Sequence, residues 1–291
     1  MKNRNLLHWI IFIALALTWG SSFILMKRGL DTYSSDQVAA LRIFIAFLFL
    51  LPIAYRHIRK NLFPLLPAFA GMGIFGNLLP AFLFTKAETT ISSALTGILN
   101  SLTPIFTLLL GLFIFKQKTK WTQILGLAIG LSGAISLVSL GKDGVNHGNV
   151  FVGSGFVVLA TLFYGLSVNI IKAKLSGVNS ITATVFAMCI IGPIAGIYLF
   201  TTDFVHRLLI MPHALQSLGF VSILAIFGTA LSVMVFNILI KEAGTLFASS
   251  VTYLIPVFAM MWGAFDGEAI TFVHGIFILV ILCGVWLVNR K

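Results

Sequence analysis

The sequence predicts an all-α integral membrane protein in which ten transmembrane helices form two inverted five-helix repeats. Composition is the first reason, because 59% of the 291 residues are hydrophobic and only 9% are charged. A soluble domain carries about 25% charged residues, so this chain lacks the polar surface that a water-soluble fold needs. The pattern of apolar runs and a duplicated proline motif are the other two reasons.

Crossing the hydrocarbon core of a bilayer takes about 20 mainly apolar residues per helix. The first apolar run continues past Ala14-Leu15-Ala16 to Met26, so we interpret it as an uncleaved helix and not as a signal peptide. Short connections leave no room for a soluble catalytic domain, and we do not expect an enzyme. The expected spans are residues 8–27, 37–55, 63–85, 91–115, 121–140, 150–172, 179–201, 216–240, 245–265 and 269–289.

Two sets of matched residues indicate the duplication. Pro104 and Gly111 recur 152 positions later as Pro256 and Gly263, each time with an apolar residue and Phe directly after the proline. Gly20 and Lys27 recur 145 positions later as Gly165 and Lys172. These offsets predict one repeat in residues 1–141 and a second in residues 150–291, joined by a loop at 142–149. Five spans per repeat place the two repeats in opposite orientations.

The formal net charge of +11 does not indicate nucleic-acid binding. With ten spans and a cytoplasmic N-terminus, most of the 19 Lys and Arg residues fall on the cytoplasmic side, as the positive-inside rule describes. We therefore expect a multi-pass protein of the plasma membrane, the inner membrane in bacteria, with both termini cytoplasmic. The expected partners are the lipid bilayer and a small-molecule substrate, without nucleic acid, metal or cofactor, for a monomer or weak homodimer.

Several motifs resemble the EamA family of the drug/metabolite transporter superfamily. They are Trp19-Gly20-Ser21, Arg42, the two Pro-Xaa-Phe segments and Gly267-Glu268. The resemblance implies ten helices in two inverted repeats and the transport of small metabolites. One departure is that Phe115-Lys116 occupies the place of Gly-Glu in the first repeat, so any role of that glutamate extends only to Glu268.

The candidate site consists of polar side chains within apolar spans. Pro80, Pro104 and Pro256 are predicted kinks that free the carbonyls of residues 76, 100 and 252, either to line a cavity or to be paired again by neighbouring hydroxyls. Arg42 is a gating or coupling candidate, although it could also snorkel to the interface, and His274 is a weaker one. The predicted substrate-binding residues are Trp19, Ser22, Asn77, Asn100, Tyr164, Asn169, Asn237, Thr252 and Tyr253.

These residues predict a secondary transporter that works by alternating access, most simply an exporter. No Asp or Glu lies deep in a span, so we do not expect strong proton coupling through a buried carboxylate. The amide, hydroxyl and aromatic side chains favour neutral or zwitterionic solutes, such as amino acids with apolar side chains. A flippase for lipid-linked substrates and a gated channel are alternatives. An intramembrane serine hydrolase would use Gly130-Leu131-Ser132-Gly133 with His274 as base, although Gly126 and Gly130 favour helix packing there.

Overall fold

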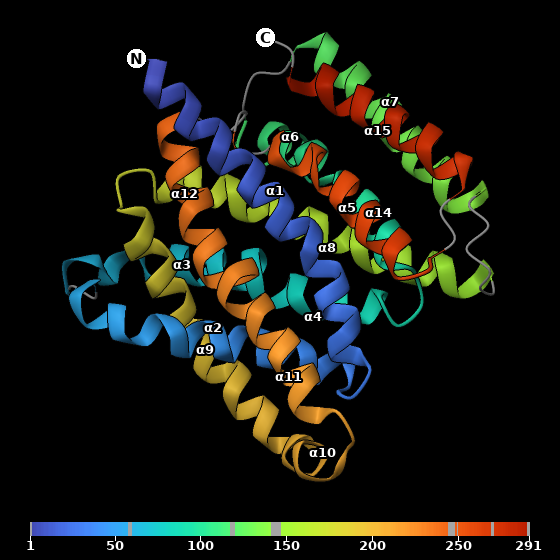
Figure 1. Cartoon of the computed structure of the whole chain (residues 1–291). Coiled ribbons are helices and arrows are strands. Elements are labelled where there is room, and N and C mark those ends of the chain that lie inside the picture. The colour runs from blue at the N-terminus through green and yellow to red at the C-terminus, as the bar shows by residue number, and fades with distance from the viewer. Residues whose placement is uncertain are drawn as a thin grey trace.

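The computed structural model describes residues 2–57, 60–116, 120–140, 147–243, 248, 250–268 and 271–289. In these residues the chain is helical and contains no β-strand (Figure 1). Seven helical stretches are long and apolar enough to cross a membrane, and Val251–Phe265 and Phe272–Gly284 are shorter apolar helices. The protein is therefore an all-α, multi-pass integral membrane protein.

The helices up to residue 140 follow the expected spans, but two of those spans are not uniform α-helices. A π-helical segment interrupts the third span, and a turn at Ser101–Leu102 divides the fourth. The elements are α1 (Lys2–Leu30), α2 (Ser35–His57), the 3₁₀ turn η1 (Lys60–Leu65), α3 (Leu66–Gly73), the π segment η2 (Ile74–Leu78), α4 (Leu79–Ala87), α5 (Ser93–Asn100), α6 (Thr103–Phe113) and α7 (Trp121–Leu140).

The later helices repeat this order, including a π-helical segment in the third long helix. Helix α8 starts at His147, so the last three residues of the predicted loop 142–149 are helical, and residues 142–146 lie outside the described residues. The elements are α8 (His147–Lys174), α9 (Ser180–Thr201), the short α10 (Phe204–Ile210), α11 (Ala214–Ile223), the π segment η3 (Leu224–Leu231), α12 (Ser232–Ala243), the 3₁₀ turn η4 (Ser250–Tyr253), α14 (Ile255–Phe265) and α15 (Phe272–Asn289).

Pro104 and Pro256 lie at the starts of α6 and α14, whereas Pro80 lies within the continuous helical stretch Leu62–Ala87, just after the π segment η2. Pro104 and Pro256 occupy the first or second position of their helices. Proline suits this position because the first amides of a helix have no intrahelical acceptor. The expectation of kinked continuous helices is therefore wrong for the fourth span, where α5 ends at Asn100 before α6 begins at Thr103.

Close helix pairs surround the centre of the molecule. α2 packs on α9, α1 on α14, α8 on α6 and α7 on α15; the last pair forms one edge of the molecule in Figure 1. Glycines permit the approach: a Cβ on Gly20 of α1 would overlap Phe258 of α14, and one on Gly165 of α8 would lie 2.7 Å from the Thr107 amide of α6. A Cβ on Gly284 of α15 would overlap the backbone at Gly126 and Gly130 of α7, so those glycines serve packing.

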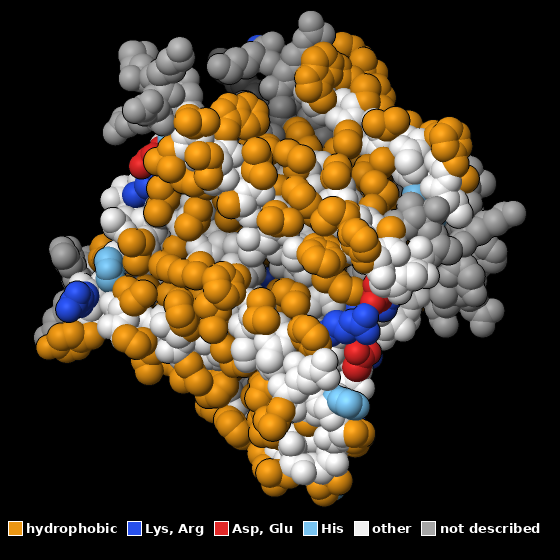
Figure 2. Space-filling view, viewed as in Figure 1, with side chains coloured by type: hydrophobic (Ala, Val, Ile, Leu, Met, Phe, Trp, Pro, Cys, Tyr) orange, Lys and Arg blue, Asp and Glu red, His pale blue; other side chains and the backbone are white. Residues whose placement is uncertain are grey.

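The surface supports a position within a bilayer. Figure 2 shows hydrophobic side chains covering most of the visible face, with charged side chains gathered in small groups. We call the end where α1 begins the N-terminal face and the end where α1 finishes the opposite face. Helix α15 starts beside the opposite face, where Glu268 contacts Lys27, and runs back toward the side on which α1 begins (Figure 1).

Candidate functional site

A cavity of about 900 Å³, which includes space open to solvent, lies between helices from both parts of the chain. Most of its wall is apolar, with aromatic rings and a few polar groups. The predicted residues that line it are Trp19, Ser22, Arg42, Asn77, Asn100, Tyr164, Asn237 and Thr252.

The two π segments contribute polar groups to this wall. Asn77 lies in η2, and Gly228 of η3 lines the cavity with its carbonyl bonded to the Trp19 indole N–H at 3.0 Å. A π turn displaces the backbone from the regular ladder, and such turns often occur at functional sites. Gly228 also lets η3 approach α1 closely, since a Cβ on Gly228 would lie 2.8 Å from the Ser22 hydroxyl.

Aromatic rings form two matched pairs along the cavity. The rings of Trp19 and Phe236 meet edge to face with centroids 5.0 Å apart, and those of Phe84 and Tyr164 stack at 5.7 Å. All four residues line the cavity. Such pairs provide rigid apolar walls, which suit the apolar body of an amphipathic solute.

Arg42 is buried in the cavity wall and does not extend to the interface, so the snorkelling interpretation is wrong. Its Nε donates to the Thr229 hydroxyl at 2.7 Å, and one Nη lies 4.0 Å from the Met26 sulfur. In the described part of the chain, no acidic side chain forms an ion pair with it. A guanidinium has five N–H donors, and a buried charge is costly unless it is paired. Arg42 therefore suits an anionic group of a bound solute.

Asn237 and Asn100 provide polar groups elsewhere in the cavity. The Asn237 amide nitrogen donates to Thr184 at 3.0 Å, while its Oδ1 is buried and has no hydrogen-bond partner within the described residues. A buried acceptor left unpaired favours a donor from a ligand. The Asn100 carbonyl accepts from the Thr103 hydroxyl at 2.9 Å, so Thr103 pairs the group that Pro104 was expected to free.

The structure places three predicted site residues outside the cavity wall. Asn169 donates its amide to the carbonyls of Gly165 and Thr107, which joins α8 to α6. Tyr253 packs against the hydrophobic core. His274 is buried and bonded to the Thr271 hydroxyl at 2.8 Å, beside the start of α15.

The serine-hydrolase hypothesis is not supported by the surroundings of its nucleophile. Ser132 is exposed on α7 and donates to the Ile129 carbonyl at 2.8 Å. A serine nucleophile needs a base within hydrogen-bond reach, whereas the candidate base His274 bonds to Thr271. This segment of α7 therefore serves helix packing.

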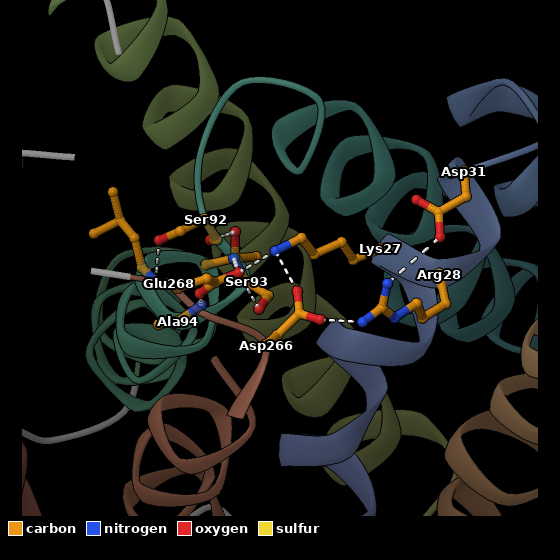
Figure 3. Close-up of polar contacts among 10 residues, drawn as sticks. Lys27, Arg28, Asp31, Ser92, Ser93, Ala94, Asp266 and Glu268 are labelled. Carbon is orange, nitrogen blue, oxygen red and sulfur yellow. Dashed lines mark hydrogen bonds and ion pairs between the residues drawn. The ribbon is translucent and has the colours of Figure 1, made fainter. Parts of the chain in front are cut away.

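An ion-pair network lies at the opposite face, and it was not among the predictions from the sequence (Figure 3). Lys27 of α1 lies 2.6 Å from Asp266 and 2.9 Å from Glu268, and Arg28 also pairs with Asp266. Glu268 in addition accepts hydrogen bonds from Ser93 Oγ at 2.7 Å and from the amides of Ser93 and Ala94 at 3.1 and 3.0 Å. These bonds tie α1, the start of α5 and the α14–α15 hairpin together.

Glu268 is held in its charged form. Burial alone would raise the pKa of its carboxyl group, but hydrogen bonds from Lys27, Ser93 and Ala94 outweigh that effect and lower the pKa below its usual value. The amides of Ser93 and Ala94 belong to the first turn of α5, where a negative charge is also favoured by the helix dipole. Two features of the sequence could have indicated this contact: the motif Gly267-Glu268, and the correspondence of Lys27 with Lys172 at an offset of 145 residues.

A second group of hydrogen-bonded polar side chains lies at the same face. Gln37 of α2 donates to Asp203 at 2.7 Å, and Arg207 lies 2.8 Å from the other oxygen of Asp203. The hydrogen bond from Arg207, with one from Gln37, lowers the pKa of Asp203 despite partial desolvation. Thr32 and Ser217 bond at 3.0 Å nearby. The opposite face is thus linked across helices from both parts of the chain.

The fold and the cavity together define a multi-pass membrane protein whose helices enclose a central space with a few polar groups, the arrangement expected of a transporter. The chain belongs to the EamA-like transporter family, whose sequence model matches residues 7–139 and 151–290. This result confirms the resemblance drawn from the motifs.

Individual relatives cover nearly the whole chain. YedA of Escherichia coli K12, described as an uncharacterized inner membrane transporter, is 27% identical over 297 residues, covering 99% of this chain and 93% of YedA. An uncharacterized transporter of Archaeoglobus fulgidus is 25% identical over 287 residues, covering 97% and 99%. Protein PagO of Salmonella typhimurium is 25% identical over 255 residues, covering 86% and 82%. A solved crystal structure shares the fold with a TM-score of 0.63 at 14% identity, covering 96% and 94%.

Proposed function

We propose that this protein is a secondary transporter in which residues 1–141 and 150–291 form two inverted five-helix repeats around the central cavity. It would export small neutral or zwitterionic solutes that carry a carboxylate and an apolar body, such as apolar amino acids, by alternating access. The observation that carries this proposal is the duplicated cavity wall. Trp19, Ser22 and Met26 of α1 correspond, 145 positions later, to Tyr164, Ser167 and Ile171 of α8, and all six line the cavity.

Helix contacts support the inverted relation. Gly20 of α1 packs against α14, and its counterpart Gly165 of α8 packs against α6. The two ring pairs correspond in the same way, because Trp19 with Phe236 matches Tyr164 with Phe84. Each repeat thus contributes its first helix to the other repeat's wall, the arrangement that a two-fold axis in the membrane plane produces.

The charges in the cavity support a solute with a carboxylate. Arg42 has no counterpart cation at the matching place, since Ala187 lies 145 positions later, so the positive charge is confined to one side of the cavity. The unpaired Asn237 Oδ1 provides an acceptor for an ammonium group elsewhere on the wall. An amino acid would satisfy both groups while its side chain contacts the aromatic rings.

The ion pairs and hydrogen bonds around Glu268 and Asp203 lie at the opposite face, which supports a conformation that is closed there. We assign this face to the periplasmic side of the inner membrane. The lining residues of α8, which run from Tyr164 to Ile171, lie in the C-terminal half of that helix, nearer the N-terminal face. That side would be cytoplasmic, as the distribution of Lys and Arg predicts. A cytoplasmic solute would then enter the cavity before export. One chain encloses the cavity, so a monomer suffices.

Transport in proteoliposomes tests the proposal. Radiolabelled leucine, phenylalanine, the amino acid amides and simple aliphatic amines would be compared, with unlabelled solute inside the vesicles. We expect counterflow of leucine or phenylalanine but not of the amides or amines, and its loss in Arg42→Gln with retention in Arg207→Gln. A flux without counterflow would indicate a channel, and movement of labelled lipid in place of the amino acids would indicate a flippase.

A further inference from the structure

Glu88 is a buried carboxyl group for which the transport scheme above has no role. It lies at the C-terminal cap of α4, one residue beyond the membrane-spanning stretch Leu62–Ala87. Both carboxyl oxygens are buried, and neither has a hydrogen-bond partner among the residues that the structure describes. A buried carboxylate without a partner is so costly that proteins commonly keep such a group protonated.

The surroundings of Glu88 favour the protonated form. The ionisable groups on the elements around it are Lys27 and Arg28 of α1, Asp36 and Arg42 of α2, Tyr164 of α8, Asp266 and Glu268 of the hairpin, and the exposed Lys86 on its own helix. Burial raises the pKa of Glu88 well above its usual value, and the Glu268 carboxylate adds to the increase, whereas Lys27 and Arg42 oppose it without cancelling it. Lys27 is already engaged by Asp266 and Glu268.

Along the chain, Glu88 lies between a residue of the cavity wall and a residue of the ion-pair network at the opposite face. Its amide donates to the carbonyl of Phe84 at 3.0 Å, and Phe84 lines the cavity one helical turn away. Five residues further along the chain, Ser93 donates to Glu268, a member of the network in Figure 3. Any movement that opens the opposite face must separate this network and bring water to the carboxyl group.

We propose that Glu88 is the proton-binding site that couples export to the proton gradient: it takes up a proton from water when the opposite face is open, holds it while that face is closed, and releases it through the cavity to the N-terminal face. This inference rests on the transport function proposed above. When solute enters the cavity from the N-terminal face, the O–H proton passes to water in the cavity beside Phe84, one helical turn away, so one proton moves inward as one solute moves outward. The resulting carboxylate takes up a proton again from the opposite side once that face opens. This inference replaces the expectation that no buried carboxylate is present for such coupling.

Infrared spectroscopy tests the proton site without any substrate. The full-length protein in lipid nanodiscs would be titrated from about pH 3 to pH 9, which spans the usual carboxyl pKa of about 4.3 and well beyond. We expect a protonated-carboxyl band that persists at neutral pH in the wild type and in Asp31→Asn, and is lost in Glu88→Gln. Absence of the band from the wild type, or its persistence in Glu88→Gln, would overturn the proposal.

Carbodiimide labelling provides a second measurement that needs no variant. Dicyclohexylcarbodiimide reacts with protonated carboxyl groups in apolar surroundings, and mass spectrometry locates the adduct. We expect modification of Glu88 in the wild type, slower as the pH rises, and none of the exposed Asp31. A wild-type protein that is never modified at Glu88 would contradict the assignment even if Glu88→Gln fails to fold.

Transport of leucine and phenylalanine then tests coupling. A pH gradient across proteoliposomes should drive their accumulation in the wild type, whereas Glu88→Gln should retain counterflow and lose the gradient-driven part. Equal gradient-driven accumulation in both proteins would refute coupling through Glu88. If neither solute moves in the wild type, the proposed function fails for them, and the infrared and labelling results still decide whether Glu88 holds the proton.

Discussion

Replacing Glu268 by Gln removes one negative charge from the closed face and keeps the shape of the side chain. The carboxylate is only 8% exposed and accepts four hydrogen bonds, from Lys27, from Ser93 Oγ and from the amides of Ser93 and Ala94. A glutamine amide offers one acceptor oxygen and turns the other position into a donor. At least one donor of α5 therefore loses its acceptor in Glu268→Gln.

The size of the effect follows from these contacts. A hydrogen bond to a charged group contributes about 1.5–3 kcal/mol, while the ion pair with Lys27 adds less than about 1 kcal/mol because the lysine side chain is 37% exposed and screened. We therefore expect Glu268→Gln to reduce the free energy that favours the closed conformation by about 2 kcal/mol. Since these bonds exist only while the opposite face is closed, the ratio of closed to open molecules should fall about 30-fold.

Thiol labelling measures this ratio. Ser22→Cys places a thiol in the cavity wall, in a background where Cys189 and Cys283 are changed to Ala. A membrane-impermeant maleimide added on the opposite face should label it at least tenfold faster in Glu268→Gln. Asp31→Asn is the matched control, because Asp31 is 59% exposed and its distance to Arg28 is 3.8 Å. Equal labelling of Glu268→Gln and wild type would refute the view that this network closes the face.

Three further predictions follow from the packing, the cavity and the titration of Glu268. Gly20→Ala and Gly165→Ala should each destabilise the protein by about 1–3 kcal/mol through overpacking, seen as a lower thermal unfolding midpoint, whereas Gly155→Ala, where a Cβ meets nothing within 4 Å, should not. Asn100→Ala should lower the leucine counterflow rate, whereas Tyr253→Phe, outside the cavity wall, should leave it unchanged; the opposite pattern would reassign the site. Because the folded-state pKa of Glu268 is lowered, its contribution to closure is complete above the unfolded pKa of about 4.3 and is lost as the pH falls through the folded value. Because the reactive thiolate fraction falls in both proteins as the pH is lowered, the labelling rates of the Ser22→Cys thiol are compared at each pH. The ratio of the wild-type rate to the Glu268→Gln rate should rise below about pH 4.

The membrane character and much of the cavity wall could be predicted from the sequence because they depend on local chemistry. Helices in lipid satisfy their own backbone groups, so apolar runs such as 8–27 and 179–201 are sufficient signals. Polar residues within those runs tend to face protein, which is why Asn77, Asn100 and Asn237 could be chosen as candidates. The repeat offsets of 145 and 152 then paired residues that the structure brings to one wall.

The roles of individual polar groups could not be predicted, since they depend on which groups meet after folding. Asn169 looked equivalent to Asn237, yet two carbonyls of neighbouring helices accept its amide protons. Arg42 could have turned toward the interface, but Thr229 of η3 holds its Nε. Glu88 gave no signal because it follows a span directly, and its oxygens are buried only when α8, α2 and α1 pack against α4.

Residues 1–141 provide the clearest test of the proposed inverted relation, because their sequence departs from that of residues 150–291 at the position of Glu268. Glu268 corresponds, 152 positions earlier, to Lys116, and its partner Lys27 corresponds, 145 positions later, to Lys172. Lys116 is exposed with a left-handed backbone (φ 51°), and Gly267 beside Glu268 is also left-handed (φ 79°). The N-terminal face thus has a lysine where the opposite face has the carboxylate that binds Lys27.

Lys116→Glu should therefore introduce on the N-terminal face the kind of ion pair that closes the opposite face. Its contribution should be about 1 kcal/mol, since an exposed pair is screened, and this would shift the population about fivefold toward molecules closed at the N-terminal face and open opposite. The Ser22→Cys thiol should then react faster with maleimide from the opposite face. Lys116→Gln, which removes the positive charge without adding a carboxylate, is the control. If the two variants react equally fast, the ends of α6 and α14 are not equivalent, and the proposed inverted repeat does not extend to these positions.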